Sequence, residues 1–441
     1  MSTKSHIHVV GVGGVGMSAL AELLLAQGCD VSGSDRTVDQ GGQSEIIETL
    51  KAAGLRIVPQ DGSSITADTK ALCVSTAIEA DNPEFVAAQK LGVEVVHRAA
   101  MLARLAAGKR VIAITGTAGK TTVTALVGYL LEQAGFDPTV VNGGVILNWR
   151  APNRLGNVRL GHSDLWIIEA DESDRSLLQF HPEHAIITNI SKDHFELQEV
   201  QELFRQFAAQ VSGSIISGAG VGKVIGRSTV EAPINVERGK DGWGFTFAGV
   251  PFAPLMPGWH NAENAKLAVV LCHKLGADLA AVQSALARFG GVHRRLEMLG
   301  RLHGARVIDD YAHNPAKIAA SWLAAAESSD RVLAYWRPHG FAPLALMHEE
   351  LVEALSGVMR SRDRLFVLPV YYAGGTAKRT MDSADFVAAL TARNLSVELV
   401  VDYPALRARL EAEADVDAVI LGMGARDPEL PRFAASLVFT P

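Results

Sequence analysis

The chain has 441 residues, of which 48% are hydrophobic and 20% are charged, and its formal net charge is −7. This length predicts about three domains, and the composition is that of a globular rather than a disordered protein. A modestly acidic chain lacks the broad basic surface of a nucleic-acid-binding protein, so no nucleic-acid partner is expected. No apolar stretch approaches the roughly 18 residues that span a membrane, so we expect no membrane partner and a cytoplasmic location.

Three cysteines, Cys29, Cys73 and Cys272, lie far apart in the sequence. Their odd number and wide spacing indicate neither a disulfide framework nor a zinc site. We therefore expect free, buried thiols in a reducing compartment.

Short apolar runs rich in β-branched residues alternate with Ala/Leu-rich segments along nearly the whole chain, which is typical of α/β domains with parallel sheets. The first predicted domain, residues 1–107, begins with a strand at 6–10, a glycine-rich turn and a helix that ends near Gln27. Its further strands are expected at residues 30–34, 71–75 and 93–96.

The second predicted domain, residues 108–292, opens with a strand at 111–115, a second glycine-rich turn and a helix over 120–133. Its later strands and helices are expected at residues 165–170, 185–189, 199–211, 264–275 and 280–289. Between 212 and about 257 the pattern loosens, which predicts a small antiparallel sheet. The third predicted domain, residues 293–441, alternates strand and helix about five times, as in a doubly wound domain.

The first glycine turn, Gly11–Gly16, satisfies the GxGxxG pattern after a strand and before a helix. Glycines let the backbone approach a diphosphate, and the helix N-terminus supplies amide donors. Asp35 follows where an acidic residue could bind a ribose or a base. The pattern by itself leaves open NAD or FAD, another diphosphate ligand, or a merely tight turn.

The second turn, Gly116–Thr122, also follows a strand and opens a helix. It lacks the full P-loop spacing because Ile114 occupies the position of the first glycine. Its glycines, its lysine and its hydroxyls are nevertheless the groups that hold nucleotide phosphates and Mg²⁺. We interpret this turn as a phosphate-binding loop.

Acidic residues from Glu169 to Asp174 follow the next strand, at the end where carboxylates can hold a cation beside a phosphate loop. Asp193 and His194 follow a later strand, and a neutral imidazole there could be a metal ligand. Taken alone, the first group also fits a solvated acidic loop, and the histidine also fits a surface or capping residue.

Two further groups of residues are candidates for the site. Asn261 and Asn264 are three residues apart at an expected helix start, where capping explains one of them and adenine contact would explain the pair. Arg294–Arg295 and Asp309–Pro315 are charged segments at junctions, where ligand sites often lie. As isolated patterns, all of these also fit ordinary structural residues.

Taken in order, the motifs of the chain resemble those of the Mur ligases, the ATP-dependent amide-forming enzymes of peptidoglycan precursor synthesis. The segments that carry the resemblance are GVGGVGMS, GSD, STAIEADNPE, GTAGKTT, EADESD, TNISKDH, PGWHNAENA, RRLE and DDYAHNP. The resemblance implies a Rossmann-like UDP-binding domain, a P-loop ATP-binding domain and a C-terminal Rossmann-like domain that closes over the site. It also implies that ATP and Mg²⁺ serve to join a UDP-N-acetylmuramoyl carboxylate to an amino acid, with L-alanine the first choice.

The same resemblance implies roles for individual residues. The UDP-linked substrate would be held by Gly11, Gly13, Gly14, Gly16, Asp35 and Ser75. ATP would be held by Gly116, Thr117, Gly119, Lys120, Thr121, Thr122, Asn261, Asn264, Arg295 and Asp310. Mg²⁺ would be held by Thr121, Glu169 and His194, and the catalytic groups would be Lys120, Glu169, His194 and Arg295. The amino acid would lie beside Tyr311, His313 and His339.

The chain departs from the family pattern at Ala118, which replaces a histidine in the phosphate loop, and in the third domain. There Asn314 replaces a second histidine, Lys317 a glutamate, and Arg337 and Gly340 the ends of a Gln-Pro-His-Arg run. Three alternatives therefore stay open: a muropeptide-recycling or other ligase with a different acceptor, a nucleotide-sensing protein without turnover, and an NAD-dependent oxidoreductase. We expect a monomer or a homodimer.

Overall fold

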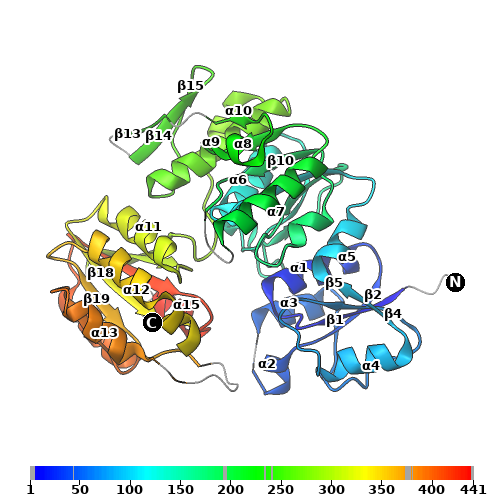
Figure 1. The fold of residues 1–441 in the computed structure, drawn as a ribbon, viewed down its shortest axis with the longest axis horizontal. Coiled ribbons are helices and arrows are strands. Elements are labelled where there is room, and N and C mark those ends of the chain that lie inside the picture. Colours follow the sequence, from blue (N-terminus) through cyan, green and yellow to red (C-terminus); the bar gives the residue numbers. More distant parts are fainter. Residues whose placement is uncertain are drawn as a thin grey trace. The chain divides into compact units, whose positions relative to one another are not determined.

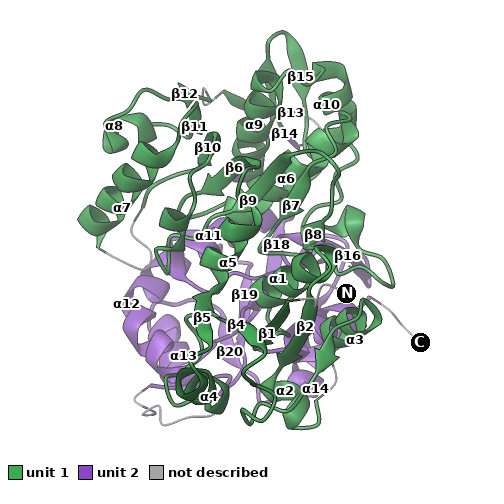
Figure 2. Cartoon of the chain, turned by 90° about the vertical axis from the view of Figure 1, so that its right-hand side faces the viewer, with its two compact units in different colours: residues 1–237, 244–255, 261–292 green, residues 238–243, 256–260, 293–441 purple. Residues whose placement is uncertain are grey.

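The computed structural model describes residues 5–42, 44–191, 196–232, 235–239, 242–372, 379 and 381–438. The chain divides into two compact units (Figure 2): unit 1 comprises residues 1–237, 244–255 and 261–292, and unit 2 comprises residues 238–243, 256–260 and 293–441. Two large sheets lie in unit 1 and a third lies in unit 2. The expected three-domain α/β architecture is confirmed, while the domain boundaries after residues 107 and 292 remain predictions.

The first sheet of unit 1 has five parallel strands in the order β3-β2-β1-β4-β5 (Figure 1). The strands are β1 (His6–Val10), β2 (Asp30–Ser34), β3 (Arg56–Ile57), β4 (Thr69–Val74) and β5 (Glu94–His97). The helices are α1 (Val15–Ala26), α2 (Arg36–Asp39), α3 (Glu45–Ala52), α4 (Pro83–Leu91) and α5 (Arg98–Leu105). The strand order reverses at β1, between β2 and β4, and ligands of open α/β sheets bind at such a point. The first glycine turn follows β1 there.

A buried network of hydrogen-bonded polar side chains crosses this first sheet. His8 and Glu84 are both fully buried, and His8 Nε2 lies 2.8 Å from Glu84 Oε1. Ser34 donates to the other carboxylate oxygen at 2.6 Å, and Ser32 Oγ lies 2.7 Å from His8 Nδ1. When Ser32 donates to His8 and His8 donates to Glu84, each of these donors has an acceptor, and both Glu84 oxygens accept a hydrogen bond. These hydrogen bonds thereby connect β1, β2 and the first turn of α4.

The second sheet of unit 1 has the strand order β12-β11-β10-β6-β9-β7-β8, and its described pairs are parallel apart from β7–β8. The strands are β6 (Arg110–Thr115), β7 (Thr139–Val141), β8 (Val158–Arg159), β9 (Leu165–Glu169), β10 (His184–Ile187), β11 (Ile215–Ser217) and β12 (Val230–Glu231). The helices are α6 (Lys120–Gln133), α7 (Leu197–Gln210), α8 (Val221–Ile225), α9 (Trp259–Lys274) and α10 (Leu279–Leu286), with short 3₁₀ turns at Leu147–Trp149 and Ser176–Gln179. Every residue of α6 from Thr121 to Leu131 is buried, so this helix is a rigid base for the loop before it.

A separate three-stranded sheet consists of β13 (Val236–Gly239), β14 (Gly242–Phe247) and β15 (Val250–Phe252). β14 and β15 are antiparallel, with Phe245 opposite Phe252. The small antiparallel sheet expected in this region is therefore confirmed.

The sheet of unit 2 has the order β16-β17-β21-β18-β19-β20, in which β16 is antiparallel to β17 and the other pairs are parallel. The strands are β16 (Glu297–Leu302), β17 (Ala305–Asp310), β18 (Arg331–Arg337), β19 (Arg364–Val367), β20 (Val397–Leu399) and β21 (Ala418–Gly424). The helices are α11 (Pro315–Ala326), α12 (Phe341–Val358), α13 (Ser383–Thr391), α14 (Tyr403–Glu413) and α15 (Glu429–Ser436). This is the doubly wound domain that the alternating pattern predicted.

Several details differ from the expectations. Helix α9 begins at Trp259 rather than at residue 264, and β16 and the helices α3, α4 and α5 were not expected. All three cysteines are free, but Cys29 is only partly buried, whereas Cys73 and Cys272 are buried as expected. Within the described ranges, every helix is too short or too polar to cross a membrane.

Candidate active site

The second glycine turn lies between the end of β6 and the first turn of α6, and its backbone requires glycine at two positions. Gly116 and Gly119 have φ angles of 133° and 85°, which side chains rarely allow. A Cβ on Gly116 would lie 2.0 Å from Thr188 Oγ1, and one on Gly119 would lie 2.6 Å from Asn264 Oδ1. Larger residues at these positions would therefore displace the turn from its neighbours.

The loop that follows β10 holds the tip of this turn. Thr188 Oγ1 and Asn189 Nδ2 both donate to Ala118 O, at 2.6 and 3.0 Å. Ala118 N donates to Asn189 Oδ1 at 3.0 Å, and Thr117 Oγ1 donates to the same oxygen at 2.6 Å. The turn is thus fixed through its backbone, and the exposed methyl group of Ala118 takes no part in these bonds.

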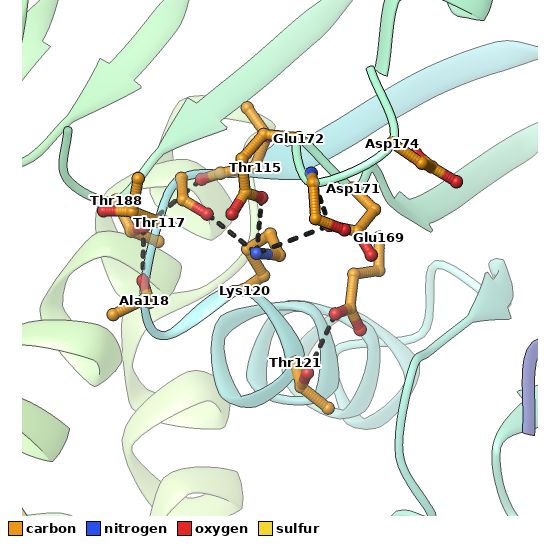
Figure 3. A network of polar contacts seen from close by, with 12 residues as sticks. Thr115, Thr117, Ala118, Lys120, Thr121, Glu169, Asp171, Glu172, Asp174 and Thr188 are labelled. Atoms are coloured by element: carbon orange, nitrogen blue, oxygen red, sulfur yellow. Dashed lines mark hydrogen bonds and ion pairs between the residues drawn. The ribbon is translucent and has the colours of Figure 1, made fainter. Parts of the chain in front are cut away.

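Lys120 is the first residue of α6, and oxygen atoms surround its ammonium group (Figure 3). Nζ donates to Gly116 O at 3.0 Å and to Glu172 Oε2 at 2.5 Å, and it lies 3.8 Å from Asp171 Oδ1. Burial by itself would lower the pKa of Lys120, but the carboxylates of Glu172, Asp171 and Glu169 outweigh it and raise the pKa. Lys120 is therefore a stable cation beside the phosphate loop.

Thr121 and Glu169 supply oxygen atoms of the kind that Mg²⁺ prefers. Thr121 Oγ1 donates to Glu169 Oε1 at 2.8 Å, and Gly143 N donates to Glu169 Oε2 at 2.6 Å. A hydroxyl and a carboxylate next to a buried lysine would fit a magnesium ion that also contacts phosphates. His194, the third expected ligand, lies outside the described residues. Within the ranges that are described, no three His, Cys, Asp or Glu side chains form a metal site.

Two more carboxylates on the loop after β9 face Lys120. Glu172 has a side-chain exposure of 2%, whereas that of Asp171 is 39%. Burial raises the pKa of Glu172 to about 7, although Lys120 lowers it. Burial also acts to raise the pKa of Asp171, but Lys120 and the hydrogen bonds from Ser173 prevail and lower it. One lysine thus faces several carboxylates, and Glu172 protonates more readily than Asp171.

Asn261 and Asn264 are the third and sixth residues of α9, so neither of them is the residue that precedes the helix. Both side chains are buried, and Asn264 Nδ2 donates to Asn261 Oδ1 at 3.4 Å. Asn264 also borders Gly119 of the phosphate loop. Helix capping is therefore wrong for either residue, and adenine contact remains a prediction.

The first glycine turn is held by Asp35 on one side and covered by Arg98 on the other. Gly13 N donates to Asp35 Oδ2 at 3.0 Å, and Thr37 N donates to Asp35 Oδ1 at 2.9 Å. The same carboxylate therefore caps α2 and holds the glycine turn. A Cβ on Gly16 would lie 3.1 Å from Arg98 Cδ and 3.1 Å from Arg98 Nη1. The guanidinium therefore lies over the first turn of α1.

Arg98 was not among the residues expected at the site. A guanidinium over a helix N-terminus is repelled by the helix dipole unless an anion lies between the two. Ser75 follows β4, the parallel neighbour of β1, and so lies at the same edge of the sheet as Gly11 and Gly14. This edge therefore combines a glycine turn, a hydroxyl and a cation, which are groups that bind a diphosphate.

In unit 2, the adjacent arginines Arg294 and Arg295 have different environments. Arg294 is buried, and its Nε donates to Asp309 Oδ2 at 2.9 Å. Its Nη atoms donate to the carbonyl oxygens of Gly424 and Ala425 at 2.8 and 3.2 Å. The guanidinium groups of both arginines lie near the Tyr311 ring, 5.3 Å from its centre for Arg294 and 5.4 Å for Arg295. Arg294 thus fastens the segment before β16 to the sheet.

Asp310, at the end of β17, is buried and shapes its own loop. Its Oδ1 accepts from Ala312 N at 2.8 Å and from Ser321 Oγ at 3.0 Å, and its Oδ2 accepts from Leu296 N at 2.7 Å. Burial raises the pKa of Asp310, although the nearby charge of Arg295 lowers it. The ribose contact expected for this residue remains a prediction.

Tyr311, His313 and His339 lie together in unit 2. The ring centres of Tyr311 and His313 are 5.5 Å apart, and those of His313 and His339 are 5.2 Å apart. His313 Nδ1 lies 2.9 Å from Tyr311 O, and because a carbonyl only accepts, Nδ1 carries the proton and Nε2 is an acceptor. Burial lowers the pKa of His313 to about 4, and the charge of Lys317 adds to this effect.

Two of the residues that depart from the family pattern have structural roles in unit 2. Asn314 is the N-cap of α11, and its side chain accepts from Lys317 N at 2.9 Å. Arg337 donates to Pro369 O at 3.1 Å and to Asp427 Oδ2 at 2.5 Å. Its guanidinium also lies 5.5 Å and 5.6 Å from the ring centres of Tyr371 and Tyr403. The charge of Arg337 is therefore compensated inside unit 2.

Comparison with known families and proteins gives a consistent picture. Three domain families match successive segments: "Mur ligase family, catalytic domain" over residues 6–110, "Mur ligase middle domain" over 114–216 and "Mur ligase, glutamate ligase domain" over 294–426. The UDP-N-acetylmuramate–L-alanine ligases of Rhodopseudomonas palustris (strain HaA2) and Nitrobacter winogradskyi are 38% and 37% identical to this chain, and each alignment covers 88% of this chain and 87% of the relative.

Solved structures agree with these matches. The UDP-N-acetylmuramate-alanine ligase of Thermotoga maritima superimposes with a TM-score of 0.79 at 26% identity, covering 98% of this chain and 97% of that one. A murein peptide ligase of Psychrobacter arcticus gives 0.66 at 19% identity over 99% and 100% of the two chains, which shows the shared fold.

Proposed function

Because the chain belongs to the Mur ligase family, we propose that it joins the carboxylate of UDP-N-acetylmuramate to L-alanine and converts ATP to ADP and phosphate. Two relatives named for this activity are 38% and 37% identical to the chain and align with most of it. The structural observation that carries the proposal is the meeting of Lys120, Thr121 and Glu169 beside a glycine turn. These groups are typical of sites that transfer phosphoryl groups rather than hydride, so an NAD-dependent oxidoreductase is disfavoured.

The proposed reaction has two steps. A carboxylate oxygen of the UDP-linked substrate attacks the γ-phosphorus of ATP, the bond from this phosphorus to the β–γ bridging oxygen breaks, and ADP leaves. The neutral amine of the amino acid then attacks the carbonyl carbon of the acyl phosphate. The bond between this carbon and the phosphate oxygen breaks, phosphate leaves, and the nitrogen gives up one proton as the amide forms.

The residues of the chain serve mainly to bring two anions together and to offset their repulsion. Lys120 would contact the β- and γ-phosphates, and Arg295 would add a second positive charge. Thr121, Glu169 and His194 would hold Mg²⁺, which neutralises phosphate charge when it is bound. The glycines at 116 and 119 let the backbone come close to the phosphates.

The other assignments follow the same logic. Gly11–Gly16 and Ser75 would hold the UDP diphosphate, with Asp35 fixing the turn. Tyr311, His313 and His339 would line the amino-acid side, where His313, neutral at physiological pH, offers an acceptor at Nε2.

A phosphate-release assay tests the proposal directly. The purified chain would be given Mg·ATP and UDP-N-acetylmuramate together with each member of a panel of amino acids and short peptides. Release with L-alanine and not with the other members is expected. Release with a tripeptide alone would assign a muropeptide-recycling ligase instead, and silence with every pair would remove the proposed activity.

A further inference from the structure

Glu172 is a buried carboxylate to which the proposed reaction gives no role. Its Oε2 atom lies 2.5 Å from Lys120 Nζ. Its Oε1 atom is also buried and has no hydrogen-bond partner among the residues that the structure describes. Figure 3 shows Glu169, at the end of β9, beside Thr121, and Glu172, on the loop that follows β9, beside Lys120.

The ammonium group of Lys120 is already surrounded by oxygen atoms. An ammonium group has three N–H donors. Gly116 O and Glu172 Oε2 accept from Lys120 at 3.0 and 2.5 Å, and Asp171 Oδ1 lies 3.8 Å away. One N–H donor is left over, so a nucleotide whose β- and γ-phosphates both bind Lys120, as proposed above, must displace one of the two oxygens that accept from it. Glu172 is the closest of them, and its contact is assisted by charge.

We propose that Glu172 is a positioning residue: its carboxylate binds Lys120 until a nucleotide phosphate takes the place of the carboxylate. Because the phosphate must compete with this negative charge, Glu172 weakens ATP binding. The inference rests on the proposed function, because it takes ATP as the ligand. Leaving a buried carboxylate without its cation costs free energy. Among the described residues, no hydrogen-bond donor meets the second oxygen of Glu172 to offset that loss. In return, the long side chain of Lys120 is ordered before the nucleotide arrives.

The test is the affinity of Glu172→Gln for a non-hydrolysable ATP analogue with Mg²⁺, measured by calorimetry at pH 8.5. The glutamine amide oxygen can still accept from Lys120, but it carries no negative charge, so the attraction between two opposite charges is lost. We expect the analogue to bind about tenfold more tightly than to the wild type, which corresponds to ~1.4 kcal/mol. The KM for ATP should fall similarly, while the KM values for the UDP-linked substrate and the amino acid stay unchanged.

Two matched variants separate charge from shape. Glu172→Asp keeps the charge and should bind the analogue within about threefold of the wild type. Asp171→Asn removes a charge that is more exposed and more distant, and it should also change the affinity by less than about threefold. If E172Q does not fold, as judged by thermal melting, Glu172→Leu removes the same charge and should again bind the analogue more tightly.

The outcomes distinguish this inference from the function on which it rests. A wild-type chain that ignores the Mg·ATP analogue would remove the proposed function. A wild-type chain that binds the analogue, with the charge-removing variant binding equally or more weakly, would overturn the role of Glu172 alone. Weaker binding would mean that the carboxylate contacts the nucleotide or its metal ion directly.

Discussion

The buried pair of His8 and Glu84 should contribute strongly to the stability of unit 1, and Glu84→Gln tests this. Glutamine preserves the size of the side chain but replaces one carboxylate oxygen by an amide that donates. His8 Nε2 and Ser34 Oγ both donate to Glu84, at 2.8 and 2.6 Å. One of these donors would therefore lose its acceptor, in a site where both members of the pair are fully buried.

The magnitude follows from two contributions. A buried donor without an acceptor costs about 1–3 kcal/mol, and a bond that is no longer charge-assisted loses about 1 kcal/mol more. We therefore expect a loss of about 3 kcal/mol in the free energy of unfolding, and a melting temperature lower by about 6–12 °C for a unit of this size. Urea unfolding monitored by circular dichroism measures the first quantity, and a thermal melt measures the second.

The matched control is Glu94→Gln on β5. Arg104 donates to both Glu94 oxygens, at 3.0 and 2.6 Å, so the geometry is good, but the two side chains are 52% and 54% exposed. Exposed pairs contribute less than about 1 kcal/mol. Equal losses of stability in the two variants would refute the reasoning, because burial is the property that distinguishes the pairs.

Three further predictions concern the site. Lys120→Ala should lower turnover about a thousandfold in the phosphate-release assay, since a preorganised charge on the transferring group is lost, while the circular dichroism spectrum stays that of the wild type. Arg98→Ala should raise the KM for the UDP-linked substrate about ten- to a hundredfold, the value of one charge-assisted bond, and leave the KM for ATP unchanged; the opposite pattern in steady-state kinetics would place Arg98 at the nucleotide. Burial lowers the pKa of His313 to about 4 from 6.5, so the unfolded chain binds the extra proton first and the stabilisation is lost as the pH falls from about 6.5 towards 4. Urea titrations at pH 7 and pH 5 measure how much the free energy of unfolding falls between these pH values. This fall should be smaller in His313→Gln than in the wild type, by up to about 2 kcal/mol.

The local part of the site was predictable from the sequence, and α6 illustrates why. A strand, two glycines and a lysine are followed by a stretch without proline, which places the helix at Lys120–Gln133, and the structure gives the same bounds. Helix α9 was misjudged because asparagines favour N-caps. Gly258, with a φ of 90°, precedes the helix instead, so the asparagines fall inside it.

Contacts between distant segments could not be read from the sequence. Glu172 lies 52 positions after Lys120, and nothing in EADESD says which of its carboxylates reaches the lysine. Arg98 opens a helix in a segment with no ligand motif, and only the fold brings it over Gly16. Strand β16 was missed because Gly300 interrupts its alternation and its pairing with β17 shifts register between Met298 and Gly300.

The environment of Arg337 bears on how substitutions in this family are interpreted. A basic residue in place of a neutral one suggests a new attraction for an anionic ligand, yet this guanidinium lies between two tyrosine rings and against Asp427. Its charge is paired with that of Asp427, and its hydrogen bonds tie the end of β18 to the segments around Pro369 and Asp427. A substitution at Arg337 should therefore reduce the rigidity of unit 2 more than it changes which acceptor the protein prefers.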